Sequence, residues 1–165
     1  MNTETLRALQ APLKQKYRED PDAAVVTLRA SGEATEAISC KVDTGRALVE
    51  AGLHPATGGG GSLACSGDML LEALVACAGV TLRAVSTAIG VNLRRATVTV
   101  DGDVDFRGTL GVTKEAPVGF REIRVRFDLD TDADEAQKAN LIRLTERYCV
   151  VLQTLRQPPA VSLQA

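Results

Sequence analysis

The chain has 165 residues, a length that fits one domain, and a formal net charge of −2. Hydrophobic residues make up 45% of it and charged residues 24%, which is typical of a globular protein with a packed core and argues against general disorder. The slightly acidic balance and the aromatic content of 3% provide no electrostatic or stacking basis for binding nucleic acid.

The N-terminus has no basic start followed by an apolar run, so it is not typical of a signal peptide. The longest apolar region, from Leu70 to Val85, is interrupted by Glu72 and Arg83, and we therefore expect no membrane span. These two observations predict a cytoplasmic protein in a reducing environment.

Reducing conditions argue against a structural disulfide framework. The chain has one histidine, His54, and no pair of cysteines with CxxC spacing, so we expect no metal site. The four glycines at 58–61 are not followed by Gly-Lys-Ser/Thr, which argues against a phosphate-binding loop, and we expect no cofactor. Two interpretations remain for the cysteines: they are inert buried thiols, or they take part in redox or nucleophilic chemistry. The four are Cys40, Cys65, Cys77 and Cys149.

The N-terminal part of the sequence predicts a helical extension followed by strands. Leu6, Leu9, Leu13 and Tyr17 share one helical stripe within residues 1–22, although Pro12 interrupts it. Alternating or β-branched residues predict three strands, with a turn at residues 31–36 and Cys40 in the core of the sheet. These strands cover residues 23–30, 37–42 and 46–50.

A glycine-rich loop then leads into a helix at residues 69–89. Ser66 is a good helix cap, Asp68 suits the positive end of the helix dipole, and Gly90 predicts the helix end. Apolar side chains cover most of the circumference, which predicts a buried helix. One sheet in a chain of this size can hardly cover such a helix, so we expect a dimer that packs around it.

The C-terminal half predicts two more strands and two more helices. Alternation predicts a strand at 96–100 that continues through residues 101–112 as a strand or as a strand with a turn, and a clearer strand at 123–129. A helix capped by Thr131 or Asp132 follows, with three side chains directed inward: Leu141, Leu144 and Tyr148. A helical turn at 150–155 and an edge strand at 161–163 end the chain. The element order predicts a single α+β domain, residues 1–165, with a mostly antiparallel sheet.

Two cysteines lie in apolar helical contexts, Cys77 in LEALVACAGV and Cys149 in TERYCVVLQ. A cysteine in such a place is most often a small, inert hydrophobic residue. To act as a nucleophile it needs a depressed pKa. Cys77 lies too deep in its helix to benefit from the helix N-terminus, so we expect an arginine from elsewhere to be the only charge able to outweigh burial.

The segment SGDMLLEALVACAGVTL, followed later by LTERYCVVLQTL, resembles the OsmC/Ohr family of osmotically inducible and organic hydroperoxide resistance proteins. The strands DFRGTLGV and APVGFREIRVRF between them are also similar, and the resemblance covers about residues 23–163. It implies an intertwined homodimer with thiol peroxidase chemistry. Cys77 would attack a hydroperoxide, Cys149 would resolve the sulfenic acid to a disulfide, and a dithiol reductant would restore both thiols.

The resemblance also implies an arginine that activates the nucleophile and a glutamate ten residues before it. Here that glutamate position is Gly67, so Asp68 or Glu72 would have to replace it. Arg29 is the first candidate for the arginine. The alternatives are Arg46 and Arg107.

Other interpretations remain open at this point. Cys65 is either an alternative resolving thiol or a loop cysteine without a role, and we expect His54 to be an exposed loop residue. The missing glutamate favours a non-catalytic dimer of the same fold that binds a small apolar ligand around Cys77, or a structural stress-response protein. The paired cysteines favour the enzyme.

Overall fold

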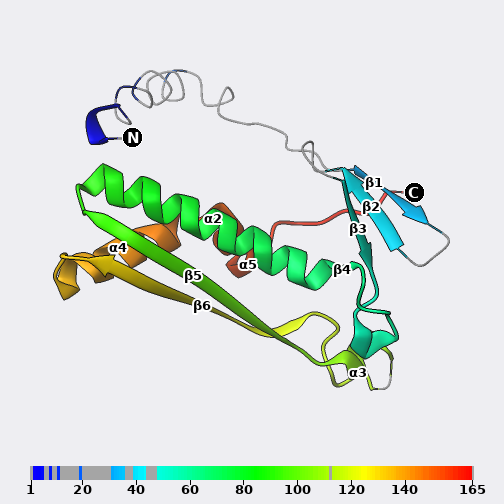
Figure 1. Cartoon of the computed structure of the whole chain (residues 1–165). Helices are drawn as coiled ribbons and strands as arrows, with labels where there is room; N and C mark the ends of the chain where they lie inside the picture. The colour runs from blue at the N-terminus through cyan, green and yellow to red at the C-terminus, as the bar shows by residue number, and fades with distance from the viewer. Residues whose placement is uncertain are drawn as a thin grey trace. The chain divides into compact units, whose positions relative to one another are not determined.

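The computed structural model describes residues 2–5, 8, 11, 19, 31–35, 39–43, 48–111 and 113–164 (Figure 1). The strand predicted at 23–30 and most of the helical extension predicted within residues 1–22 lie outside these residues, although 3–5 are helical. The chain forms two compact units. The first contains Ala73–Thr99 and residues 126–164, and the second contains the described residues between 31 and 72 together with 100–125.

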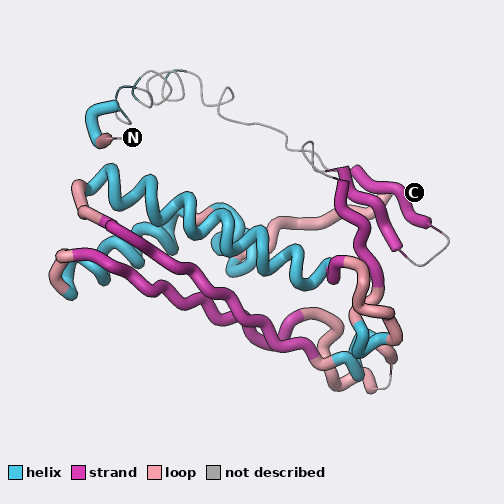
Figure 2. The backbone as a smooth tube through the Cα atoms, viewed as in Figure 1, coloured by secondary structure: helices cyan, strands magenta, loops and turns pink. Residues whose placement is uncertain are grey.

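A four-stranded sheet in the second unit has the order β1-β2-β3-β4. β1 (Ser31–Thr35), β2 (Ser39–Asp43) and β3 (Leu48–Gly52) are successive antiparallel neighbours (Figure 2), and β4 (Ala64–Cys65) pairs parallel with β3. β2 and β3 confirm the strands predicted at 37–42 and 46–50. The predicted turn at 31–36 is wrong, because pairing with β2 holds β1 extended despite its small and polar residues.

The long helix α2 spans Ser66–Ile89, which confirms the helix predicted there. It ends as the sequence predicted, at Gly90, whose φ of 76° is in the left-handed region that favours glycine. The Gly90 N–H donates to the Thr87 carbonyl at 3.4 Å, and the Val91 N–H donates to the Ser86 carbonyl at 2.9 Å. This pair of hydrogen bonds is the Schellman arrangement, which satisfies carbonyls that the helix itself leaves unpaired.

Only part of α2 is buried within the described chain. Leu74, Ala78 and Leu82 form a buried stripe, whereas Val80 is 72% exposed. This agrees with the expectation that a single chain can hardly cover such a helix, and the dimer expected to cover the exposed part stays a prediction. By length and composition α2 would also suffice to span a membrane, contrary to the sequence-based expectation. The core helix of a soluble protein can have the same length and composition, and 22% of the apolar window of α2 is buried within the described chain.

The core of the first unit lies between helices and a β-hairpin. β5 (Leu93–Val104) and β6 (Phe120–Thr131) form a two-stranded sheet, and α4 (Glu135–Tyr148) follows. β6 confirms the strand predicted from alternation at 123–129. Four buried side chains form the centre of this core, two from α2 and one each from β5 and α4: Leu82, Val85, Leu93 and Leu141. Antiparallel strands packed on a long helix make this an α+β fold.

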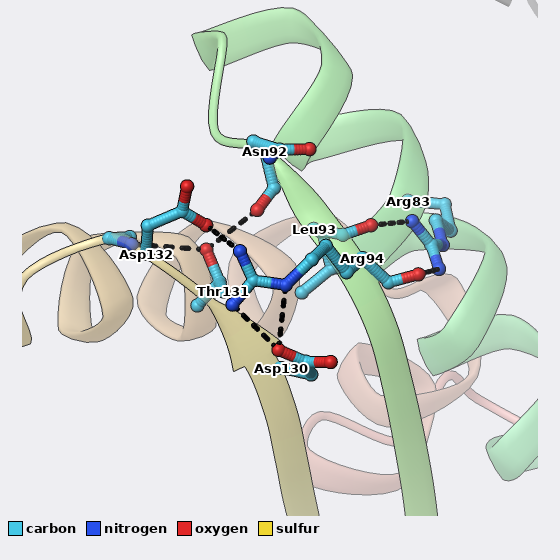
Figure 3. A network of polar contacts seen from close by, with 8 residues as sticks. Arg83, Asn92, Leu93, Arg94, Asp130, Thr131 and Asp132 are labelled. Atoms are coloured by element: carbon cyan, nitrogen blue, oxygen red, sulfur yellow. Dashed lines mark hydrogen bonds and ion pairs between the residues drawn. The ribbon is translucent and has the colours of Figure 1, made fainter.

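Polar contacts connect the ends of these elements (Figure 3). Arg94 near the start of β5 forms ion pairs with Asp130, near the end of β6, at 2.8 Å and with Asp132, which follows the strand. Arg83 of α2 donates to the backbone carbonyls of Leu93 and Arg94. The carbonyl contacts anchor α2 to the start of β5, while the exposed ion pairs contribute little to stability individually.

Four local predictions in the C-terminal half are wrong. The strand predicted to continue through 101–112, with or without a turn, ends at Val104, and Phe106–Thr109 forms the short helix α3 because Asp105 caps it. Asp134, not Thr131 or Asp132, caps α4 through a reciprocal capping box with Gln137. Tyr148 is 58% exposed, and Thr145 is buried on that face instead. Residues 161–163 form no strand.

Candidate active site

Cys77 and Cys149 come together in the first unit, and both are free thiols. Cys77 lies in the middle of α2 beside Ala76 and Ala78, and its side chain is half-buried. Cys149 is fully buried, and its thiol interacts directly with the Cys77 sulfur. The structure therefore brings the two residues singled out in the sequence into one site.

Cys149 occupies the break between α4 and α5 (Val150–Arg156). Its N–H donates to the Thr145 carbonyl at 2.9 Å, and its carbonyl accepts from Gln153 N–H at 2.9 Å, so it ends one helix and begins the next. The Gln153 side chain also donates to the Glu146 carbonyl at 2.8 Å, and Arg156 forms an ion pair with the Glu146 carboxylate. These contacts hold the first turn of α5 in place beside Cys77.

The local environment lowers the pKa of Cys77. Burial acts in the opposite direction and is the largest single influence. It is outweighed by four donors that favour the thiolate: the Val151 N–H, the Cys149 thiol, the Thr81 hydroxyl and the Val150 N–H. Among the described residues, amide, thiol and hydroxyl groups thus favour the Cys77 thiolate, and the activating arginine expected from the sequence stays a prediction.

The pKa of Cys149 is shifted in the opposite direction, upwards. Burial raises the pKa of Cys149, and the neighbouring Cys77 raises it further, against the opposing effect of the Leu152 and Val151 amides. A proton on Cys149 is thus favoured when Cys77 is ionised. The pair consists of one sulfur poised to become a thiolate and one thiol that donates to it.

The arginines considered from the sequence do not join this pair in the described residues. Arg29 and Arg46 lie outside the described part of the chain. Arg107 pairs with its neighbour Asp105, with Nη2 2.6 Å from Oδ2 and Nε 2.9 Å from Oδ1. This ion pair holds the pKa of Asp105 at about 2.

Asp68 and Glu72, the proposed replacements for a glutamate, are both exposed on α2. Neither forms an ion pair with another residue that the structure describes. Gly67 lies close to two other side chains: a Cβ at this position would lie 3.5 Å from Phe120 Cζ and 3.6 Å from Cys65 Sγ. The structure therefore places Gly67 against apolar groups and not against a described arginine.

Cys65 and His54 lie together elsewhere, in the second unit, where both line a cavity of about 240 Å³. His54 is half-buried and stacks on Phe106, with ring centroids 4.9 Å apart. The expectation of an exposed loop histidine is therefore wrong. Among the described residues, no three His, Cys, Asp or Glu side chains are grouped so that they could hold a metal.

Comparison with protein families adds the decisive observation. The model of the OsmC-like protein family matches residues 59–164, which include both cysteines of the site. The chain belongs to the OsmC-like family. The family includes thiol-dependent hydroperoxide reductases, and the membership confirms the resemblance found in the sequence. A comparison with curated protein sequences gives no match.

Solved structures show the same OsmC-like fold at low sequence identity. An OsmC-like protein from Mycoplasma pneumoniae is 16% identical with a TM-score of 0.68, over 81% of this chain and 89% of that one. An organic hydroperoxide resistance protein from Legionella pneumophila is 16% identical with a TM-score of 0.64, over 81% and 92%. One from Elizabethkingia anophelis, with crystallant-derived thiocyanate bound, is 16% identical with a TM-score of 0.66, over 82% and 91%.

Sequence reasoning identified the two cysteines of this OsmC-like chain but missed the groups that act on them. Thr81 follows Cys77 by four residues, so helical spacing could have placed it on the same face. The sequence contains no comparable signal for the amides of Val150 and Val151, because their position beside Cys77 depends on the packing of α5 against α2.

Proposed function

We propose that this OsmC-like protein is a thiol-dependent hydroperoxide reductase, with Cys77 as the nucleophile and Cys149 as the resolving thiol. The observation that carries the proposal is the contact between the two sulfurs with opposite pKa shifts, lowered at Cys77 and raised at Cys149. A peroxidatic cysteine reacts as the thiolate, so the residue with the lowered pKa is the one suited to attack.

In the first step, the Cys77 thiolate attacks the terminal oxygen of ROOH and the O–O bond breaks. The leaving alkoxide takes up one proton as ROH, and the sulfur is oxidised to Cys77–SOH. In the second step, the Cys149 sulfur attacks Cys77–SOH, an S–S bond forms, and the hydroxyl leaves as water with the Cys149 proton. A dithiol reductant then reduces the disulfide and is itself oxidised.

We also propose that the active form is a homodimer. An exposed stripe of small and apolar residues on α2 supports this: Ala73, Ala76 and Val80. A second copy of the chain would remove this stripe from water, which is favourable at roughly 25 cal/mol per Å² of apolar surface.

Arg29 stays the proposed arginine of the site. Arg29→Ala, with Arg46→Ala as its companion, tests that role by the pH at which Cys77 reacts.

The decisive experiment is a titration of the reduced protein with cumene hydroperoxide, counting free thiols and released alcohol. We expect one alcohol and the loss of two thiols for each peroxide consumed, with a Cys77–Cys149 linkage in non-reducing peptide maps. Cys149→Ser should still release alcohol but stop at an oxidised Cys77, and Cys77→Ser should release none. Cys65→Ser is the matched control and should behave as wild type.

Failure of this titration has a defined meaning. If no alcohol is released while Cys77 stays reduced, the protein is not a hydroperoxide reductase. The alternative is then a non-catalytic dimer of the OsmC fold that binds a small apolar molecule around Cys77. Linkages that contain only Cys65 would contradict the assignment of Cys149 as the resolving thiol.

A further inference from the structure

We propose that the cavity of the second unit is a binding site for a small aromatic molecule of one or two rings, separate from the Cys77–Cys149 pair. All of its lining residues belong to the second unit, whereas both members of the cysteine pair belong to the first. The walls come from the loop and short helix after β3, from β4 and the start of α2, and from α3 and the start of β6: His54, Thr57, Cys65, Ser66, Phe106 and Phe120.

One wall is a pair of stacked rings. The His54 imidazole and the Phe106 ring lie 4.9 Å apart with an angle of 16° between their planes. His54 is fixed because its Nδ1 accepts from the Ala56 N–H at 3.0 Å, as the cap of the short helix η2 (Pro55–Thr57). A rigid, flat aromatic surface of this kind favours another planar ring by stacking.

The helix that carries Phe106 is itself held tightly. A Cβ at Gly108 would lie 2.3 Å from the Pro117 carbonyl oxygen and 2.7 Å from that of Ala116, so only glycine lets α3 approach this backbone. The Thr109 hydroxyl also donates to the Val118 carbonyl at 3.3 Å. These contacts keep the aromatic wall in place without a ligand, which lowers the entropic cost of binding.

Phe120 also lines the cavity. Its ring packs on Gly102, where a Cβ would lie 2.5 Å from the ring and would displace it. A Cβ at Gly67 would lie 3.5 Å from Phe120 Cζ and 3.6 Å from Cys65 Sγ, so the missing side chain there leaves space between the ring edge and the Cys65 thiol. Two glycines therefore position the ring and keep the cavity open beside Cys65.

The size and polarity of the cavity define the class of ligand. Its volume of about 240 Å³ exceeds the ~150 Å³ cavity that holds benzene and is below the ~300 Å³ lower limit of drug-sized pockets. One or two fused rings fit this range. The Ser66 hydroxyl can accept or donate a hydrogen bond, and the Thr57 hydroxyl, which donates to the His54 carbonyl at 2.9 Å, can still accept one, so one polar substituent is compatible. Exposed apolar side chains at the rim, Leu53 and Val118, provide an apolar approach to it.

The test uses 2-naphthol as the probe with the full-length reduced protein. The chain has no tryptophan, so naphthol fluorescence can be followed without an indole background. We expect saturable binding, and a slower alkylation of Cys65 by iodoacetamide when 2-naphthol is bound, measured by peptide mass spectrometry. The alkylation of Cys77 in the same sample should be unchanged.

Two matched variants locate the site. Phe106→Leu keeps an apolar side chain but removes the ring, and it should weaken 2-naphthol binding roughly three- to tenfold, the range of one aromatic pair. Phe127→Leu makes the same substitution in the core of the first unit and should leave the affinity within about a factor of two. If Phe106→Leu does not fold, the protection of Cys65 in the wild-type protein decides.

The outcomes separate this site from the proposed reductase. Absence of binding, or an equal loss in both variants, would overturn the aromatic site while leaving the peroxide titration untouched. Protection of Cys77 in place of Cys65 would also overturn it, because the probe would then occupy the apolar surroundings of the cysteine pair. Protection of Cys65 together with an inactive Cys77 would support the site and contradict the reductase.

Discussion

Leu82→Ala is the substitution for which the structure supports the most specific expectation. Leu82 has 0% of its surface exposed and lies at the centre of the first unit's core, against Val85, Leu93 and Leu141. Removing a fully buried leucine side chain costs its transfer free energy plus the energy of the cavity left behind, in all about 3 kcal/mol. For a chain of 165 residues this corresponds to a melting temperature lowered by roughly 6–12 °C.

Urea unfolding followed by the helical circular dichroism signal, with a reductant present, measures this cost. The urea concentration at the midpoint of unfolding should fall. The slope of the unfolding free energy against urea concentration should stay the same, because the surface exposed on unfolding hardly changes. Leu163→Ala is the matched control: it makes the same substitution where the side chain is 96% exposed, and its cost should stay within about 0.5 kcal/mol. A cost below about 1 kcal/mol at Leu82, or equal costs at both sites, would refute this description of the core.

Three further predictions test the site, the assembly and an ion pair. Thr81→Val removes a hydroxyl that lowers the pKa of Cys77, so alkylation of Cys77 should require a higher pH; an unchanged profile contradicts this role. Val80→Asp places a charge on the exposed stripe of α2 and should dissociate the proposed homodimer in light scattering, whereas a wild-type monomer at micromolar concentration would exclude that dimer. Arg107 holds the pKa of Asp105 at about 2, below its value of ~3.9 in the unfolded chain. The stability that this ion pair adds to the folded protein is therefore complete above the pKa of Asp105 in the unfolded chain, and it is lost as the pH falls towards 2. Asp105→Asn should reduce this dependence of stability on acid pH. Identical acid unfolding curves would disprove the contribution.

The candidate site shows which functional features local sequence could reveal. Cys77 and Cys149 were found because each lies in a recognisable apolar helical segment. The consequence of their contact was not accessible in this way. Whether Cys77 or Cys149 ionises first depends on burial and on amide groups of α5, which belong to a segment far from Cys77 in the sequence.

The side-chain orientations in α4 also separate what the local sequence predicts from what it does not predict. The period of the α4 sequence predicted the helix, and Leu141 is buried as expected. Tyr148 was assigned to the same face, yet it is exposed and Thr145 is buried, its hydroxyl donating to the Leu141 carbonyl at 2.8 Å. A hydroxyl that satisfies itself within the helix can be buried at little cost, which hydrophobicity alone does not predict.

The sequence by itself determined the elements whose signals lie within a few residues of one another. The end of α2 at Gly90 and the alternation of β6 are of this kind, because left-handed backbone and the two faces of a strand are local properties. Tertiary structure decided which groups surround Cys77 and which rings enclose the cavity beside Cys65. These features join segments distant in sequence, and no local pattern encodes a contact that exists only after the elements have packed.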